Sequence, residues 1–313
     1  MITPCDHGGG IDDAVRRFGG ARRDWLDLST GINPRAYPVD AVTAADWCDL
    51  PDQSAFQRLE HTARDFWQVP KGAAVLATPG ASSPIAMIPH LLRPGPVTIA
   101  RATYNEHAAG FHAAGWTIAQ TSDARVVVHP NNPDGALYAG GDRDLRLLVI
   151  DESFCDVTPD KTLIARAAEP NVLVLKSFGK FWGLAGVRLG MVIGDPDLIA
   201  ALRSRIGPWQ VSGPALAIGA KALGDNDWAE KTRARLAADS EKLDEMMAAA
   251  GHHVVGGTTL FRLYDTDDAA AAQTKLARHH IWSRIFPYSK TWLRLGLPGT
   301  IADWVRLNKA LAS

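Results

Sequence analysis

Short apolar runs alternate with longer amphipathic segments over the first two thirds of the chain. The runs lie at residues 97–100, 116–119, 126–128, 147–150, 172–175 and 189–193, and they end in polar residues or glycine. Runs of this length, separated by helical patterns, are typical of a mostly parallel β-sheet covered by helices. We therefore predict an α/β domain built on these strands.

The pattern changes near residue 225. A long amphipathic helix is predicted over residues 228–250, ended by Gly251, and apolar runs follow near Val254 and Leu260. Apolar residues at helical spacing predict two further helices, over residues 269–279 and 301–312. These elements predict a second, smaller α+β domain.

Composition and charge narrow the class of protein. The 313 residues are 46% hydrophobic and 21% charged, which suits two domains around a substantial core. With 33 basic and 34 acidic residues and no basic stripe, the sequence argues against a nucleic-acid partner. No apolar run is long enough to cross a membrane and no signal-peptide pattern is present, so we expect a cytoplasmic protein. Cys5, Cys48 and Cys155 are widely separated, which predicts reduced thiols and no metal site.

The segment at residues 177–190 carries the first candidate chemistry. It places Ser177, Lys180 and Arg188 among four glycines. A lysine amine can form a Schiff base with an aldehyde, and an arginine supplies a permanent cation for a phosphate. A glycine-rich surface loop with a solvated lysine is the ordinary alternative, so the rest of the chain has to decide.

Polar side chains follow two neighbouring apolar runs. Asn132 comes after residues 126–128, and Asp151 comes directly after residues 147–150. The carboxyl ends of parallel strands are where open α/β sheets bind ligands. An aspartate there can pair with a protonated pyridine nitrogen, and Asn132 can donate to a phenolic oxygen on the same ring. Both residues are also common in ordinary turns and caps.

Two upstream features predict an anion-binding helix start and an aromatic ring that can stack on a ligand. Gly80, Ala81 and Ser82 open a helical pattern that runs to residue 92, and the first turn of a helix favours an anion. Tyr104 follows the run at residues 97–100, where its ring can stack on a planar ligand.

In their order and approximate spacing, these residues together with Arg294 resemble the motifs of the fold-type I pyridoxal-phosphate enzymes, the class I and II aminotransferase superfamily. The resemblance covers essentially the whole chain. It implies a large domain at residues 36–222 with a mostly parallel seven-stranded sheet flanked by helices, and a smaller α+β domain at residues 223–313. Residues 1–35 would form an N-terminal arm that joins the small domain and the active site. Pyridoxal 5'-phosphate and a homodimer are implied as well.

The resemblance also implies roles for individual residues. Lys180 would hold the cofactor as a Schiff base, with Asp151 at the pyridine nitrogen, Asn132 at the phenolic oxygen and Tyr104 on the ring face. The cofactor phosphate would bind to residues of two segments, Gly80, Ala81, Ser82, Ser177 and Arg188. Arg294, in Trp292-Leu-Arg-Leu-Gly, would take the substrate carboxylate as a bidentate partner.

Within the superfamily, the sequence is most similar to the branch that contains histidinol-phosphate aminotransferase and threonine-phosphate decarboxylase. His7-Gly-Gly-Gly and Leu28-Ser-Thr-Gly-Ile-Asn-Pro resemble segments of the decarboxylase, and Phe154 stands where aminotransferases commonly have a tyrosine. This implies decarboxylation of L-threonine O-3-phosphate to (R)-1-amino-2-propanol O-2-phosphate for cobalamin biosynthesis. The implied substrate-binding residues are His7, Gly31, Asn33, Asn132 and Arg294.

Two departures and two alternatives accompany this interpretation. Gly10 replaces a frequent asparagine, and Leu50 replaces a tyrosine that this branch often supplies to the partner subunit's phosphate. A firm grip of Arg294 on the carboxylate would favour proton removal over loss of carbon dioxide. An aminotransferase acting on a phosphorylated substrate such as histidinol phosphate therefore stays open, as does a pyridoxal-phosphate-binding regulatory domain without turnover.

Overall fold

The computed structural model describes residues 7–40, 42–142 and 144–313, and the chain divides into two compact units. The sheet unit consists of Ala36–Asn132 and Leu137–Glu230. The terminal unit consists of the chain up to Arg35, Pro133–Ala136 and Lys231–Ser313. The division falls within the long helix α8 (Asn226–Ala249).

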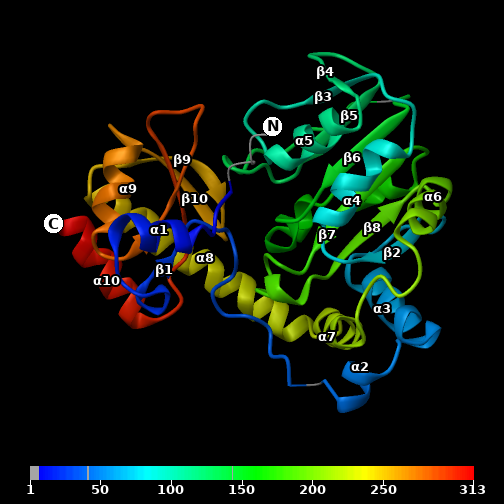
Figure 1. Ribbon diagram of the computed structural model, residues 1–313, viewed down its shortest axis with the longest axis horizontal. Helices are drawn as coiled ribbons and strands as arrows, with labels where there is room; N and C mark the ends of the chain where they lie inside the picture. The colour runs from blue at the N-terminus through cyan, green and yellow to red at the C-terminus, as the bar shows by residue number, and fades with distance from the viewer. Residues whose placement is uncertain (1–6, 41, 143) are drawn as a thin grey trace. The chain divides into compact units, whose positions relative to one another are not determined.

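The sheet unit is built on a seven-stranded sheet in the order β2-β8-β7-β6-β5-β3-β4 (Figure 1). Its strands are β2 (Ala74–Thr78), β3 (Pro96–Ile99), β4 (Thr117–Ile118), β5 (Ala124–Val128), β6 (Leu147–Asp151), β7 (Val172–Ser177) and β8 (Gly190–Gly194). All pairings are parallel except those of β8, which runs antiparallel to both β7 and β2. Every residue of β6 is buried, as expected for a central strand of a parallel sheet. The predicted α/β class and mostly parallel seven-stranded sheet are thus confirmed.

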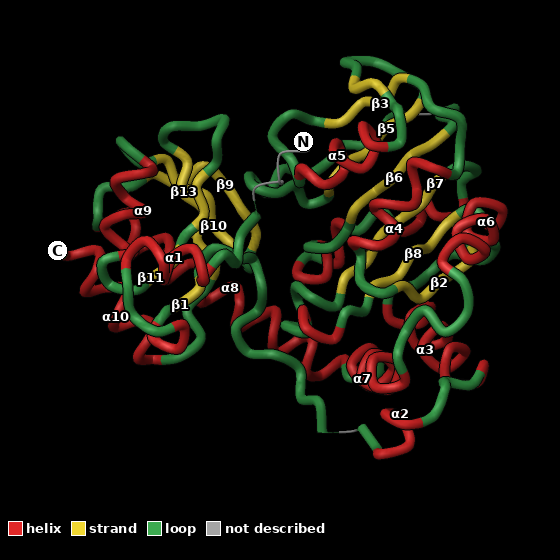
Figure 2. The backbone as a smooth tube through the Cα atoms, viewed as in Figure 1, coloured by secondary structure: helices red, strands yellow, loops and turns green. Residues whose placement is uncertain are grey.

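Helices cover this sheet (Figure 2). They are α2 (Ala44–Cys48), α3 (Gln53–Phe66), α4 (Ser82–Met87), α5 (Asn105–Ala113), α6 (Pro196–Ile206) and α7 (Gly213–Leu223), with short 3₁₀ turns at η2 (Ile88–His90), η3 (Cys155–Val157), η4 (Pro159–Lys161), η5 (Ile164–Ala168) and η6 (Ala185–Val187). Side chains of α4, α5 and α6 pack with β3, β5, β6 and β7 in one apolar core. The helix predicted to run to residue 92 ends as an α-helix at Met87, since Pro89 lacks the N–H that would continue it.

The terminal unit combines both ends of the chain. A four-stranded antiparallel sheet has the order β12-β13-β10-β9, and β1 pairs in parallel with β11. Its strands are β1 (Leu26–Asp27), β9 (His253–Thr258), β10 (Phe261–Asp265), β11 (Ile281–Trp282), β12 (Arg284–Ile285) and β13 (Trp292–Gly296). Its other elements are α1 (Ile11–Phe18), η1 (Arg22–Asp24), α9 (Ala269–Ala277) and α10 (Ile301–Ala312). Thr300 and Asp303 form a reciprocal capping box at the start of α10, which explains why this helix begins where its apolar pattern does. No helix in the described parts of the chain could span a membrane.

Candidate functional site

A pocket lies in the sheet unit at the carboxyl ends of β5, β6 and β7. The structure brings together here most of the residues that the sequence predicted for the cofactor. The lining residues are Ala81, Ser82, Ile85, Tyr104, Val128, Asn132, Asp151, Ser153, Phe154, Ser177, Gly179, Lys180, Ala185 and Arg188. They come from the ends of three strands, the start of α4 and the loop before β8, so the pocket is assembled from segments far apart in the sequence.

Asp151 is the buried acid of this pocket. One carboxylate oxygen, Oδ1, accepts hydrogen bonds from the backbone N–H of Ser153 at 2.9 Å and from its hydroxyl at 2.6 Å. The other, Oδ2, lies 2.8 Å from Nε2 of His107. Burial acts to raise the pKa of Asp151, but the hydrogen bond and charge of His107, together with the Ser153 hydrogen bonds, hold this pKa below its ordinary value. Asp151 is therefore an ionised carboxylate held in a fixed orientation.

Lys180 places its amine against an aromatic ring. Its Nζ lies 5.2 Å from the centroid of the Phe154 ring, and Phe154 is buried. Phe154 carries no hydroxyl, so this wall of the pocket beside the lysine amine is an apolar ring. Ser177 has its Oγ fixed by the backbone N–H of Gly179 at 3.2 Å.

Gly80 and Arg188 form the basic end of the pocket. A Cβ added at Gly80 would lie 2.6 Å from Nη2 of Arg188, so the guanidinium occupies the space that any other residue would fill. Gly80 has a φ of 76°, in the left-handed region that favours glycine. Arg188 is itself left-handed, with a φ of 56°, a conformation that is uncommon for a residue with a side chain. At the start of α4, no side chain caps the first turn.

Arg294 lies in the terminal unit, on β13. Arg294 is 5% exposed, and its Nη2 donates a hydrogen bond to the backbone carbonyl of Ser29 at 2.6 Å. Arg284 of β12 stands directly opposite Arg294 in the strand register. Burial and then the charge of Arg284 lower the pKa of Arg294 to about 10. Two cations at a directly opposed position repel each other, which an anionic ligand would relieve.

The remaining predicted substrate residues also lie in the terminal unit. The backbone carbonyl of His7 accepts from Arg284 Nη1 at 3.0 Å, while the residue itself is exposed. Gly31 is buried. The Asn33 side-chain oxygen accepts from Arg235 Nη2 at 2.8 Å and from the N–H of Arg35 at 3.0 Å. His7 and Asn33 thus each accept a hydrogen bond from an arginine of the terminal unit, and their roles in substrate binding stay predictions.

A more voluminous cleft, of about 550 Å³, lies at the opposite edge of the same sheet, between residues such as Asp123, Arg146 and Glu169. It is bounded by the amino ends of β6 and β7, and none of the described residues that line it is a lysine. We assign the chemistry to the pocket at the carboxyl ends, where open α/β sheets bind ligands.

Two contributors were missed by the sequence interpretation. His107 lies on α5, three residues after Tyr104, which is the extended residue at the N-cap of this helix, and the two rings meet edge to face with their centroids 6.0 Å apart. That spacing was a usable signal. Arg284 gave no such signal, because only the register of the two-residue strand β12 places it opposite Arg294.

Comparisons with known proteins show the family and the fold of the chain. Residues 119–307 match the family model described as aminotransferase class I and II. A threonine-phosphate decarboxylase of Sinorhizobium sp is 39% identical over 100% of this chain and 99% of its own length, and one of Pseudomonas aeruginosa is 36% identical over 98% and 97%. The solved structure of histidinol-phosphate aminotransferase from Sinorhizobium meliloti, in complex with pyridoxal-5'-phosphate, has a TM-score of 0.83 at 19% identity and covers 99% of this chain and 94% of that one. The chain therefore belongs to the class I and II aminotransferase family of fold-type I enzymes.

Proposed function

We propose that this protein is a pyridoxal-phosphate-dependent threonine-phosphate decarboxylase. It converts L-threonine O-3-phosphate to (R)-1-amino-2-propanol O-2-phosphate and carbon dioxide, a step of cobalamin biosynthesis. The observation that carries the proposal is the Lys180 amine held beside Phe154 in one pocket with the buried, ionised Asp151. The full-length relatives at 36–39% identity are decarboxylases of this kind.

The residues of the pocket fit pyridoxal 5'-phosphate. Lys180 supplies the amine for its aldehyde, and Asp151 supplies an anion for its ring nitrogen. Gly80 leaves room for the Arg188 guanidinium, which with Ser82 and Ser177 would bind the phosphate. Ala81 would contribute backbone, Tyr104 a ring face and Asn132 a donor to the phenolic oxygen.

When bound, the cofactor takes up the electron pair released as the bond between Cα and the carboxylate breaks. The protein's own groups control what happens around that bond. Asp151 is ionised and would keep the ring nitrogen protonated. The Lys180 amine, once free, would return a proton to Cα after carbon dioxide leaves. Arg294 would bind the substrate carboxylate, and Arg284, which stands opposite it in the strand register, would bind the substrate phosphate together with His7.

The test of this function is a direct assay of the two chemistries. Purified protein incubated with O-phospho-threonine and no oxo acid is expected to release carbon dioxide. If turnover requires 2-oxoglutarate instead, the protein is an aminotransferase of a phosphorylated substrate such as histidinol phosphate. A protein that binds the cofactor and turns over neither substrate would be a regulatory domain.

The cofactor assignment has its own control pair. The Lys180→Ala variant is expected to lose the long-wavelength absorption of the lysine-bound cofactor, whereas Lys71→Ala, at an exposed position of the same unit, is expected to keep it. An unchanged spectrum in Lys180→Ala would refute the assignment.

We also propose that the enzyme works in the cytoplasm as a homodimer, with residues 1–35 as an arm, 36–222 as the cofactor domain and 223–313 as the small domain. Trp47 and Leu50 are 73% and 67% exposed, which is unusual for large apolar side chains and supports a protein contact there. Cys48 and Cys155 carry free thiols, as a reducing compartment allows, and Cys5 lies outside the described residues. Sedimentation velocity of the purified protein tests the dimer, and a monomer that retains full activity would contradict it.

A further inference from the structure

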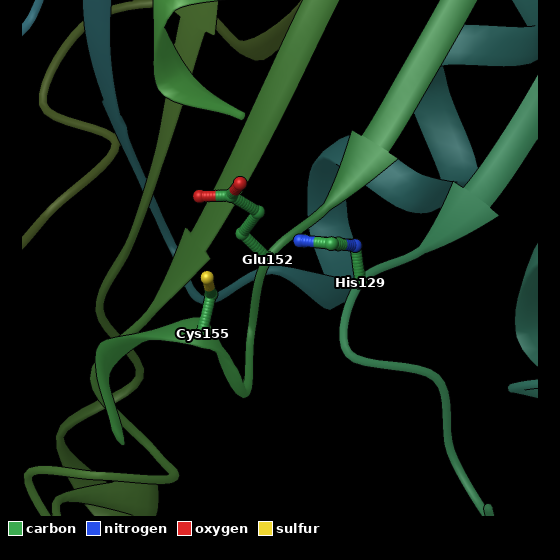
Figure 3. Close-up of side chains that lie close together, drawn as sticks. All are labelled: His129, Glu152 and Cys155. Carbon is green, nitrogen blue, oxygen red and sulfur yellow. The ribbon is translucent and has the colours of Figure 1, made fainter. Parts of the chain in front are cut away.

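Three potential metal ligands meet in the sheet unit beyond the ends of β5 and β6. Ligand atoms of His129, Glu152 and Cys155 all lie within 4.8 Å of one another, and the side chains lie close together in Figure 3. The backbone N–H of Tyr138 donates to His129 Nδ1 at 3.0 Å, so Nε2 carries the proton, and it lies 2.7 Å from the carbonyl of Lys161. Both ring nitrogens of His129 therefore already have a hydrogen-bond partner within the protein.

The other two members of this group are a buried thiol and a carboxylate that already has hydrogen-bond partners. Burial raises the pKa of the Cys155 thiol to about 12. Glu152 accepts three short hydrogen bonds, from Lys176 Nζ at 2.5 Å, Thr162 Oγ1 at 2.6 Å and the N–H of Leu163 at 2.5 Å. The group is better described as part of a hydrogen-bonded network centred on Glu152 and Lys176.

This network extends to a second buried carboxylate, Asp156. Its Oδ1 accepts from the indole N–H of Trp67 at 2.8 Å, and its Oδ2 accepts from that of Trp182 at 3.2 Å. Lys176 Nζ lies 3.7 Å from Asp156 Oδ1 as well as 2.5 Å from Glu152. One buried ammonium thus serves two buried carboxylates, and Lys176 and Glu152 are each 1% exposed.

The members of the network are neighbours in sequence of the pocket residues. Glu152 directly follows Asp151, and Lys176 directly precedes Ser177. Trp182 lies two residues after Lys180, so Lys176 and Trp182 fix this loop on both sides of the reactive amine. A buried ion pair adds little net stability over well-packed apolar residues, so stability alone does not explain a charged cluster at this place.

We propose that Glu152, Lys176 and Asp156 are positioning residues, which hold Asp151, Ser177 and Lys180 at fixed separations for the cofactor. This inference rests on the proposed function for its cofactor. The Glu152 to Lys176 contact joins the ends of β6 and β7, and the Asp156 to Trp182 hydrogen bond fixes the chain that follows Lys180. None of the three is a catalytic residue, because they act through their neighbours.

The decisive variant is the triple substitution Glu152→Gln, Asp156→Asn and Lys176→Met. Removing Lys176, alone or together with Glu152, leaves a buried carboxylate without its cation and is expected to unfold the protein at lower temperature. The triple variant removes all three charges, so the unfolding midpoint of its apo form is expected to stay within about 5 °C of the wild type. Its dissociation constant for pyridoxal 5'-phosphate is expected to rise about tenfold. Its kcat is expected to fall about 10- to 100-fold with a KM changed less than about threefold, as for a misplaced reacting group.

The matched control is Asp123→Asn. It breaks the 2.9 Å ion pair between Asp123 and Arg146 at the opposite edge of the same sheet, and wild-type cofactor affinity and kcat are expected. A triple variant with wild-type affinity and kcat would overturn the proposal, because uncharged side chains could then replace the network without any effect on the pocket. The Asp156→Asn variant keeps the shape of the side chain but cannot accept hydrogen bonds from both the Trp67 and the Trp182 indole. Wild-type cofactor affinity and kcat in this variant would also overturn the proposal.

Failure of the proposed function has a different signature. Cofactor affinity is measured by titrating apo-protein with pyridoxal 5'-phosphate and needs no substrate. If the wild type binds the cofactor and does not decarboxylate O-phospho-threonine, the proposed function fails while the comparison of dissociation constants still decides the positioning role.

Discussion

Replacing Gly80 by alanine tests the basic end of the pocket most directly. The alanine Cβ would lie 2.6 Å from Nη2 and 3.1 Å from Cζ of Arg188, which is closer than van der Waals contact allows. Because the guanidinium is the far end of a flexible side chain, we expect it to move rather than the backbone. Gly80→Ala therefore displaces the cation that would bind the cofactor phosphate.

Two magnitudes follow from this geometry. The left-handed φ of 76° at Gly80 costs an alanine about 1–2 kcal/mol of folding free energy. A hydrogen bond to a charged group contributes about 1.5–3 kcal/mol, so loss of the Arg188 contact is expected to weaken the binding of pyridoxal 5'-phosphate by about 10- to 150-fold. The two effects are of similar size, so cofactor affinity has to be compared between proteins that are both shown to be folded.

The assay is fluorescence titration of apo-protein with pyridoxal 5'-phosphate, beside thermal unfolding of the same samples. Gly186→Ala is the matched control, because Gly186 lies in the same loop as Arg188 and an added Cβ meets nothing within 4 Å. The control is expected to bind the cofactor as the wild type does. A folded Gly80→Ala protein with an affinity within about threefold of wild type would refute the assigned role of Arg188.

Three further predictions concern burial and charge. The wild-type Asp151 carboxylate, whose pKa is lowered, stabilises the fold above its unfolded pKa, and this stability is lost as the pH falls through the folded value. His107→Ala removes the partner that lies 2.8 Å from Asp151, while burial still acts to raise the pKa of this carboxyl. Acid unfolding is therefore expected to begin at a higher pH than in the wild type, and an unchanged acid-unfolding midpoint would contradict the pairing. In a Cys5→Ser background, an aromatic disulfide reagent is expected to label exposed Cys48 at once and Cys155 only on unfolding. The Cys155 thiol, whose pKa burial raises to about 12, should contribute stability that is full below pH about 9 and is lost as the pH rises toward 12, in a urea titration repeated across that range. Arg284→Met is expected to raise the KM for O-phospho-threonine about tenfold with unchanged cofactor affinity, and an unchanged KM would exclude it from substrate binding.

Much of the sheet unit could be predicted because its information is local. Each buried strand carries its own apolar run, and Asn132 and Asp151 follow two of those runs directly, so one topological rule places them together. The antiparallel direction of β8 and the strand at Ala74–Thr78 were not predicted. Strand direction depends on pairing between distant segments, and that pairing leaves no mark in the periodicity of either segment.

The buried charges show the same limit more sharply. Lys176 directly follows an apolar run, and the sequence cannot reveal that Glu152 and Asp156 pair with it. His107 could have been found from its spacing of three residues from Tyr104, but its contact with Asp151 required the packing of α5 against the strand ends. Residues that act directly were therefore easier to predict than the residues that hold them.

The pairing of β1 with β11 has a consequence for how the chain is made. Leu26 finds its partner Ile281 only after about 250 further residues have been synthesised, which takes on the order of 10 to 50 seconds at typical translation rates. The segments of the sheet unit leave the ribosome in between, so that unit can complete its core while residues 7–35 still lack their sheet. During synthesis residues 7–35 therefore stay without their strand partners, and the terminal unit can fold only after the last strands of the chain have been made.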